Sequence, residues 1–400
     1  MATKIAFKGF KQVNGLASGF TESSLEQGYV YFVRTSTDKT EGYIYFNGKK
    51  YGNIDSLDSK YDEMNKYPIV YKTTDGTGTI YAYKDASSSS YDTITVNSKG
   101  GVVWIDKDYE KIRFVSGFKS LNLLQADTRN ITNMGQMLYN CTGITSLDLS
   151  FMDTSKVTDM SSMFGGCSGL TSLDLSSFDT TNVTDMGNMF SGCSGLTSLD
   201  VSSFDTSRVT GMTGMFAKCC SLTSLDLSNF DTSQVTNMIM LFGGCSGLTS
   251  LDVSSFDTSR VTDMNGMFAR CCRLTSLNVS SFDTSQVRLM TSMFSSCSNL
   301  TSLDLSNFDT TNVVNMTGMF ISCSKLSKLT LSSSFFNSAS LTTYDFSALT
   351  AWTDTESLAN FVSVLPTITT TKTLKLSSNT KSALTADQTS TITTKGWTIA

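Results

Sequence analysis

A single pattern of amino acids recurs every 26 residues through the middle of the chain, and this period limits the possible folds most strongly. One unit, at 170–195, reads LTSLDLSSFDTTNVTDMGNMFSGCSG, and eight such units occupy roughly residues 121–328. A unit has about eight large apolar side chains, whose burial does not offset the entropy of ordering its backbone. Stacked units share a core with two neighbours, so the period predicts an array of repeats rather than two or three globular domains.

The residue types within the unit predict a short strand followed by a short helix. The leucines at 170–175 have the L-x-x-L-x-L spacing of a leucine-rich repeat, in which a strand points its leucines inward. Apolar residues at 186–190 recur at i, i+3 and i+4, which favours one face of a helix. Thr184 or Asp185 would cap this helix, and Gly195 would end it with a positive φ. We therefore expect an α/β leucine-rich repeat solenoid, right-handed by the usual crossover rule, with a parallel sheet on its concave face.

The unit at 170–195 closely resembles the BspA-like leucine-rich repeats, a 26-residue type found in surface proteins of bacteria and of some protists. The resemblance covers all eight units and implies adhesion and binding to host or matrix proteins. Residues 329–400 resemble the end of such arrays, and we expect degenerate repeats and a C-terminal cap there. In this part the expected helices are 355–365 and 385–394, and the expected strands are 373–376 and 397–399.

Residues 1–65 differ from the repeats and are expected to form a module for attachment and oligomerisation. Residues 28–34 and 43–46 are the predicted strands of a hairpin, and Asn47-Gly48 suggests a second tight turn. The run GYVYFVRTSTDKTEGYIYFNGKKYG resembles a segment near the N terminus of fibre or tail-associated proteins in tailed phages of gut anaerobes. This resemblance implies docking to virion proteins and assembly into a homotrimer.

Residues 66–120 are expected to form a second β-rich segment that caps the first repeat. A short helix at 56–67 would link it to the N-terminal module, and the serines at 87–90 would form a loop. Alternating apolar and polar residues predict its strands at 69–71, 79–83, 93–96, 102–105 and 112–115.

The composition argues against several classes of function. The chain has no His, which excludes a Ser-His-Asp or Cys-His nucleophile pair and an imidazole metal ligand. Its formal net charge is −5 and it has no basic run, which argues against nucleic acid as a partner. The acids repeat equally, whereas glycoside hydrolysis needs two carboxyl groups in different environments. We therefore expect a binding protein rather than an enzyme, with no cofactor and no metal.

The amino terminus, MATKIAFKGFKQVNGLASGF, shows no apolar region of a signal peptide. The sequence also has no apolar run of about 18 residues, so we expect no insertion into a membrane. A virion protein released by lysis reaches the outside without an export signal, which fits these observations. The alternative is that an export signal has been trimmed from the chain.

The residues between the strand leucines are the main candidates for ligand binding. By strand alternation, they and the serines two residues earlier face outward on the concave sheet. Hydroxyls and carboxylates on one surface suit sugar hydroxyls, cationic peptides or Ca²⁺, although a solvated surface without a partner explains the same pattern. The candidates are Asp148, Asp174, Asp200, Asp226, Asp252 and Asp304, with Ser172, Ser198, Ser224 and Ser250.

A second series of aspartates, from Asp153 to Asp309, follows the phenylalanine of each unit and is expected to form turn hydrogen bonds. Three residues further on, the residue type varies between Lys, Asn, Arg and Gln, which indicates an exposed edge.

The cysteines follow the same 26-residue step from Cys141 to Cys323, and we expect these eight thiols to be buried in the core. Equivalent side chains in a stack point in parallel, so neither a disulfide nor four metal ligands would converge. Cys220 and Cys272 are the remaining two. They lie two repeats apart, about 10 Å in a stack, which is too far for a disulfide. Duplication of a block of two repeats explains both.

Three functions remain open from the sequence. The first is a phage virion receptor-binding protein that recognises a bacterial surface glycan or protein through the repeats. The second is a BspA-like adhesin on a bacterial cell surface, and the third is an intracellular scaffold.

Overall fold

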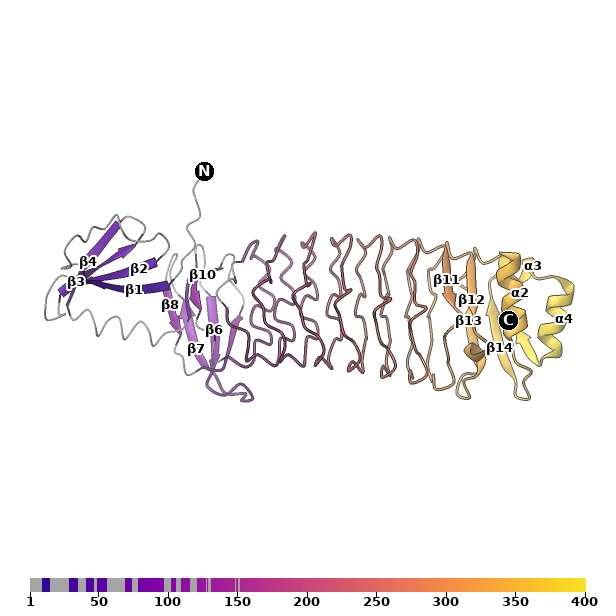
Figure 1. Cartoon of the computed structure of the whole chain (residues 1–400). Helices are drawn as coiled ribbons and strands as arrows, with labels where there is room; N and C mark the ends of the chain where they lie inside the picture. Colours follow the sequence, from indigo (N-terminus) through magenta and orange to yellow (C-terminus); the bar gives the residue numbers. More distant parts are fainter. Residues whose placement is uncertain are drawn as a thin grey trace.

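A computed structural model describes most of the repeats and all of the C-terminal part. In Figure 1 the described coils follow one another in a row, with strands at the N-terminal end and helices at the C-terminal end. The described part has few helices, and its sheets are small and both parallel and antiparallel. The described residues are 9–14, 29–34, 41–46, 49–55, 69–73, 78–96, 102–105, 109–115, 121–126, 128, 131–147, 149 and 152–400.

The first sheet has four strands in the order β1-β2-β3-β4. The predicted hairpin is confirmed, because β2 and β3 pair antiparallel with Arg34 opposite Gly42. β3 and β4 also pair antiparallel, whereas β1, which the sequence did not predict, lies parallel to β2. The helix predicted at 56–67 lies outside the described residues. The strands are β1 (Gly9–Asn14), β2 (Tyr29–Arg34), β3 (Glu41–Phe46) and β4 (Lys49–Asp55).

Two sheets of three strands follow, in the orders β10-β5-β8 and β7-β6-β9. All five strands predicted in this segment are present, and the serines at 87–90 lie in the loop between β6 and β7. Residues 121–126, where the sequence predicted the first repeat to begin, pair antiparallel with β5. The strands are β5 (Ile69–Thr73), β6 (Gly78–Tyr83), β7 (Asp92–Val96), β8 (Val102–Ile105), β9 (Lys111–Val115) and β10 (Leu121–Ala126).

Strand β9 covers the first described coil, as the sequence predicted. Lys111 forms a parallel bridge with Asn133, and the Phe114 N–H donates to the Met137 carbonyl at 2.8 Å. The Phe114 side chain is fully buried and belongs to the same apolar cluster as the repeats. The β-rich segment and the repeats therefore share one continuous core.

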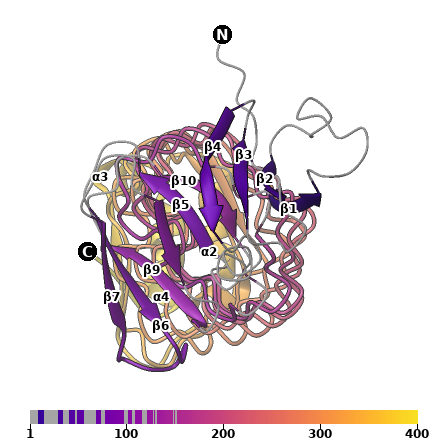
Figure 2. The same cartoon turned by 90° about the vertical axis from the view of Figure 1, so that its left-hand side faces the viewer.

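Each repeat forms one coil of chain, and hydrogen bonds join it to the next coil. In the coil at 170–195, the Met186 N–H donates to Gly211 O and the Phe190 N–H to Met215 O, both at 2.9 Å. Viewed from the N-terminal end, the coils lie behind one another (Figure 2). The continuous series of parallel bridges runs through Asn133, Asp159, Asp185, Gly211, Asn237, Asp263, Leu289 and Asn315.

The prediction of a short helix after this bridge position is wrong for the described coils. Residues 187–192 form consecutive turns, and no helix is present in the described residues 131–332. The Met189 N–H stays within its coil by donating to Met186 O, whereas the next N–H donates to the following coil. A helix would use all these donors within itself. Asn188 and Gly192 adopt positive φ values of 55° and 76°, and the predicted positive φ at Gly195 is absent.

The predicted parallel leucine sheet appears only at the end of the repeats. There β11 (Ser302–Leu305) pairs in parallel with β12 (Lys328–Leu331), with Leu303 opposite Leu329. In the earlier described coils the leucine segments do not form strands. Only isolated hydrogen bonds join them, such as the one from the Thr249 N–H to Thr223 O. Their leucines nevertheless point into the core.

A column of stacked phenylalanines runs through the middle of the core. Phe190, Phe216 and Phe242 follow one another with ring centroids 5.9 Å apart and nearly parallel planes. Each of these rings is fully buried. Stacked rings of this kind stabilise beyond the area they bury, and their shared orientation sets the register between coils.

The C-terminal part contains a parallel sheet with the order β13-β14-β15 and three α-helices. The two predicted helices and two predicted strands are confirmed. Asp354 caps the first helix by accepting the Ser357 N–H, and Thr385 and Gln388 form a capping box at the last. None of the described helices has the length and apolarity needed to cross a membrane. The elements are η2 (Ser333–Phe336), β13 (Thr343–Phe346), α2 (Thr355–Val364), β14 (Lys372–Leu376), α3 (Ser378–Ala383), α4 (Ala386–Thr394) and β15 (Trp397–Ile399).

Candidate ligand-binding surface

The serines and aspartates predicted to bind a ligand lie on one exposed surface of the repeats. Leu173 is only 8% exposed while its neighbour Asp174 faces solvent, as strand alternation predicts. Asp148 lies outside the described residues. The serine–aspartate surface, as we call it, consists of Ser172, Asp174, Ser198, Asp200, Ser224, Asp226, Ser250, Asp252, Ser276, Asn278, Ser302 and Asp304.

A local turn holds each aspartate of this surface. Asp226 Oδ1 accepts the N–H of Ser228 at 3.0 Å, and Asp252 Oδ1 accepts the N–H two residues on at 2.9 Å. Asn278 accepts the equivalent bond from Ser280 at 3.0 Å. The turn therefore needs a side-chain oxygen but no charge. It orients the carboxylates of this surface alike.

The same turns lower the pKa of the carboxyl groups. Hydrogen bonds from the backbone N–H and hydroxyl of Ser202 hold the pKa of Asp200 below its ordinary value, and the corresponding serine lowers the pKa of Asp226. The neighbouring aspartates raise the pKa of Asp226 by a smaller amount. The direction is also downward for Asp174 and Asp252. The serine–aspartate surface is therefore negatively charged at neutral pH.

A hollow of about 590 Å³ lies in the serine–aspartate surface and extends over three consecutive coils, from Ser224 to Asn278. Its rim carries Asp226 and Asp252, and Leu225 and Leu251 contribute an apolar lining. The exposed hydroxyl groups of Ser224 and Ser250 also line it and have no hydrogen-bond partner among the described residues. Four of the predicted residues therefore come together in one concave place.

The hollow combines hydroxyl donors, carboxylate acceptors and small apolar patches. This mixture suits a polar ligand with many hydroxyl or amide groups, which can bond to several coils at once. Within the part of the chain that the structure describes, no three Cys, Asp or Glu side chains are grouped so that they could hold a metal ion.

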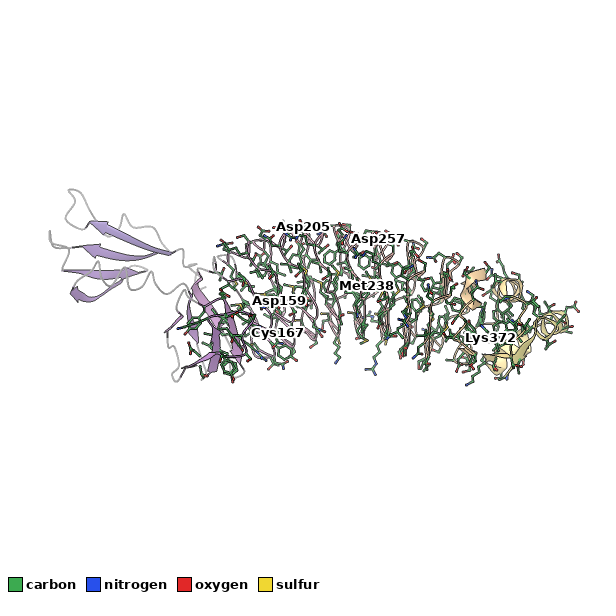
Figure 3. All side chains as sticks on the ribbon, turned by 90° about the horizontal axis from the view of Figure 1, so that it is seen from below. Asp159, Cys167, Asp205, Met238, Asp257 and Lys372 are labelled. Atoms are coloured by element: carbon green, nitrogen blue, oxygen red, sulfur yellow. The ribbon has the colours of Figure 1, made fainter. Side chains whose placement is uncertain are left out.

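The second series of aspartates makes turn hydrogen bonds, as predicted. Asp205 Oδ1 accepts the Ser207 N–H at 2.9 Å, and Asp257 Oδ1 accepts the Ser259 N–H at 2.9 Å. Asp205 and Asp257 lie along the same edge of the coils in Figure 3. At the variable position, Arg208 donates to Asn182 Oδ1 at 2.9 Å in the preceding coil. This exposed edge therefore binds coil to coil through its own side chains.

A column of buried threonines beside these aspartates was missed from the sequence. Thr206 is 1% exposed, and its hydroxyl donates to Asp231 O at 2.9 Å while accepting the Asp231 N–H at 2.8 Å. One hydroxyl thus satisfies both backbone groups of a residue in the next coil. The available signal was that this position is always Thr, although the next residue varies and is Ser in five of the eight repeats. The column comprises Thr128, Thr154, Thr180, Thr206, Thr232, Thr258, Thr284 and Thr310.

The eight periodic cysteines are buried in the core, as predicted, and all ten cysteines of the chain are free thiols. The Cys193 thiol donates to Phe164 O in the preceding coil at 3.0 Å, and Cys245 donates to Phe216 O at 2.9 Å. Burial raises the pKa of both thiols to about 12. These side chains therefore join coils as neutral donors and are poor nucleophiles.

A scan against protein-family models matches four overlapping stretches that together run from 109 to 361, more than half of the chain. The matching family is described as "Mycoplasma protein of unknown function, DUF285". The chain belongs to this family. The matched stretches are 109–219, 174–250, 195–277 and 249–361, which contain the described coils.

The overlap of the four DUF285 matches reflects the repeated unit, and it supports the resemblance of the repeats to the BspA-like type. Searches of the curated proteins and of the solved structures gave no match. The family match shows that the chain is a repeat protein and does not identify a ligand.

Proposed function

We propose that this DUF285 protein is a non-enzymatic binding protein that recognises a bacterial surface glycan or protein. The observation that carries the proposal is the hollow in the serine–aspartate surface, where Ser224 and Ser250 offer unpaired hydroxyls beside the carboxylates of Asp226 and Asp252. Because the repeat recurs in each coil, the same polar groups are presented at a regular spacing of about 4.8 Å between adjacent coils. Such spacing suits a polymer with repeated polar groups.

The stacked coils support a right-handed leucine-rich repeat solenoid whose leucine side carries the binding surface. The parallel pairing of β11 with β12 supports this assignment, because it places equivalent leucines of two coils opposite each other. In this proposal the buried methionines, phenylalanines and cysteines hold the shape, and the exposed serines and aspartates contact the partner.

The proposed location of the protein is the phage virion. Its support is the hairpin of β2 and β3, which lies within the segment that resembles phage fibre and tail-associated proteins. In this proposal residues 1–65 dock to virion proteins and form a homotrimer, so the repeats project outward. Light scattering of the full-length protein should then give three times the mass of one chain, and a strict monomer would count heavily against the proposal.

The alternative is a BspA-like adhesin on a bacterial cell surface that binds host or matrix proteins. The family match favours it, because the matched repeats are of the BspA-like type. Antibodies against the repeats distinguish the two locations. Labelling of purified virions supports the phage protein, whereas labelling of bacteria that carry no phage supports the adhesin.

The binding test compares labelled full-length protein with its D226N/D252N variant on intact bacteria and on a glycan array. Asn278 shows that asparagine keeps the turn bond, so the variant removes two charges and retains the local structure. We expect binding to fall by at least tenfold, because even one lost hydrogen bond to a charged group contributes roughly 1.5–3 kcal/mol, and tenfold corresponds to about 1.4 kcal/mol.

The D205N/D257N variant is the matched control, since it removes two aspartate charges from the second series. It should bind within about twofold of the unchanged protein. Equal binding by D226N/D252N and the unchanged protein would refute a role for the serine–aspartate surface.

A further inference from the structure

The acidic residues of the repeats are confined to one part of each coil. One segment of the repeat, from the methionines to the strand leucine that follows, has no Asp or Glu in any copy; an example is 186–199, which begins in the coil at 170–195 and ends in the next. Because the chain as a whole carries a formal net charge of −5, this acid-free segment is a local departure from its overall charge. The only charged side chains that the coils place on it are Lys and Arg.

Two of these cations lie in a second hollow. Lys218 and Arg270 are exposed and line an open groove of about 660 Å³ that extends from Gly192 to Ser296. Neither side chain has an ion pair or hydrogen bond to the described residues. Equivalent positions two coils apart are separated by about 10 Å. The groove is therefore a cationic strip with two free charges.

The residue type at these two positions differs from coil to coil, whereas the left-handed backbone there is shared with other coils, as at Ser296 and Ser322. Lys218 and Arg270 adopt φ values of 59° and 63°, in the left-handed region that side chains with a Cβ adopt at a cost. Glycine occupies the same position in the coils between and before them, at Gly192 and Gly244. A Cβ on Gly244 would lie 3.1 Å from Lys218 Cγ, so the lysine stem lies across this glycine.

The other residues of the groove select the kind of anion. Ser194 and Ser246 line it with hydroxyls, and Cys220 and Cys272 line it in the alternate coils. None of the lining residues is aromatic, whereas single-stranded nucleic acid needs aromatic platforms for its bases. Two cations are also too few for duplex DNA, which proteins bind with many phosphate contacts. An extended polymer with hydroxyls and spaced anionic groups meets these conditions.

We propose that this groove binds an acidic glycan, with Lys218 and Arg270 each contacting one phosphate or carboxylate group of the chain. The guanidinium of Arg270 offers a bidentate pair of donors for an oxyanion, and Lys218 offers a point charge on a flexible stem. This site is separate from the serine–aspartate surface, so either proposal can fail without the other.

The test measures binding of the full-length protein to labelled dextran, carboxymethyl dextran and dextran phosphate of equal length. The K218G/R270G variant removes both charges and installs the residue found at Gly192 and Gly244, so it should retain its fold. Its melting temperature, followed by circular dichroism, verifies this. We expect one or both acidic dextrans to bind at least tenfold more tightly than dextran, and K218G/R270G to lose about tenfold or more of that affinity.

The R208N/R260Q variant is the control for general electrostatics. It also removes two positive charges, and other coils carry Asn182 and Gln234 at this position. Its affinity should stay within about twofold of the unchanged protein. The acidic dextran that binds more tightly identifies whether the groove prefers a phosphate or a carboxylate. Three outcomes would overturn the proposal: no preference for an acidic dextran, equal losses in both variants, or tighter binding to single-stranded DNA.

Discussion

Replacing Thr206 with valine tests how the buried threonines join the coils. Valine keeps the shape of the side chain and removes one hydroxyl. That hydroxyl bonds to both backbone groups of Asp231, at 2.9 Å to the carbonyl and 2.8 Å from the N–H. Both groups would then lack their partner in the next coil.

The expected cost follows from these two lost bonds. An unsatisfied buried polar group costs about 1–3 kcal/mol. Asp231 has an exposed side chain, so water reaches this backbone in part and the lower half of the range applies to each group. We therefore expect T206V to lower the free energy of unfolding by about 3 kcal/mol. T206S keeps the hydroxyl and loses one methyl group, which should cost about 1 kcal/mol.

Urea unfolding followed by circular dichroism measures both variants, with a common m value as the condition for comparing midpoints. Hydrogen exchange at the Asp231 amide adds a local readout, because this N–H should exchange faster in T206V and remain protected in T206S. We expect the more apolar variant, T206V, to be the less stable one. A T206V variant as stable as the unchanged protein, or more stable than T206S, would contradict the role of the hydroxyl.

Three further predictions concern the core. Iodoacetamide should modify only Cys220 and Cys272 in the native protein. After denaturation without reductant it should modify all 10 cysteines. Fewer than 10 modified cysteines in the denatured protein would disprove the free-thiol core. Because burial raises the pKa of Cys193 and Cys245 to about 12, unfolded thiols ionise near pH 9 while folded ones stay neutral. Stability is therefore complete below about pH 9 and is lost as the pH rises towards 12, and melting temperatures that do not fall between pH 8 and pH 10.5 would contradict this. F242A should lower the free energy of unfolding in urea by about 3–5 kcal/mol, because Phe242 is fully buried between two stacked rings. The control is V314A, at a side chain 41% exposed, which should cost under about 0.5 kcal/mol. Similar costs for the two variants would count against the stacked column.

Features that depend on the alternation or periodicity of apolar residues were predictable from the sequence. The strands between 69 and 115 and the helices and strands of the C-terminal part lie where local patterns place them. The outward position of Asp174 followed from strand alternation beside Leu173.

The turn segment was not predictable from the same rule, because two structures satisfy its spacing. Met186, Met189 and Phe190 recur as on a helix face, yet the consecutive turns also bury all three. What decides between them is that alternate N–H groups bond to the following coil, which only stacked neighbours provide. Asn188 and Gly192, residue types that tolerate positive φ, were the local evidence for turns.

The candidate site was predicted in part. Strand alternation indicated which serines and aspartates are exposed, but the hollow near Ser224 and Asp226 depends on how successive coils pack. The buried threonines were missed because a threonine beside a turn aspartate is typical of an exposed turn. Their burial arises from contact with the next coil, as the bond between Thr206 and Asp231 shows.

The central claim is that the serine–aspartate surface recognises a bacterial surface polymer, and hydrogen exchange on the bound protein tests it most directly. The full-length protein is mixed with cell-wall material from bacteria that it labels, and exchange is compared with and without this material. We expect slower exchange in the segments 224–228 and 250–255, which contribute most of the lining of the hollow, and no change in the D226N/D252N variant. Protection confined to other segments, or equal protection in the variant, would contradict it.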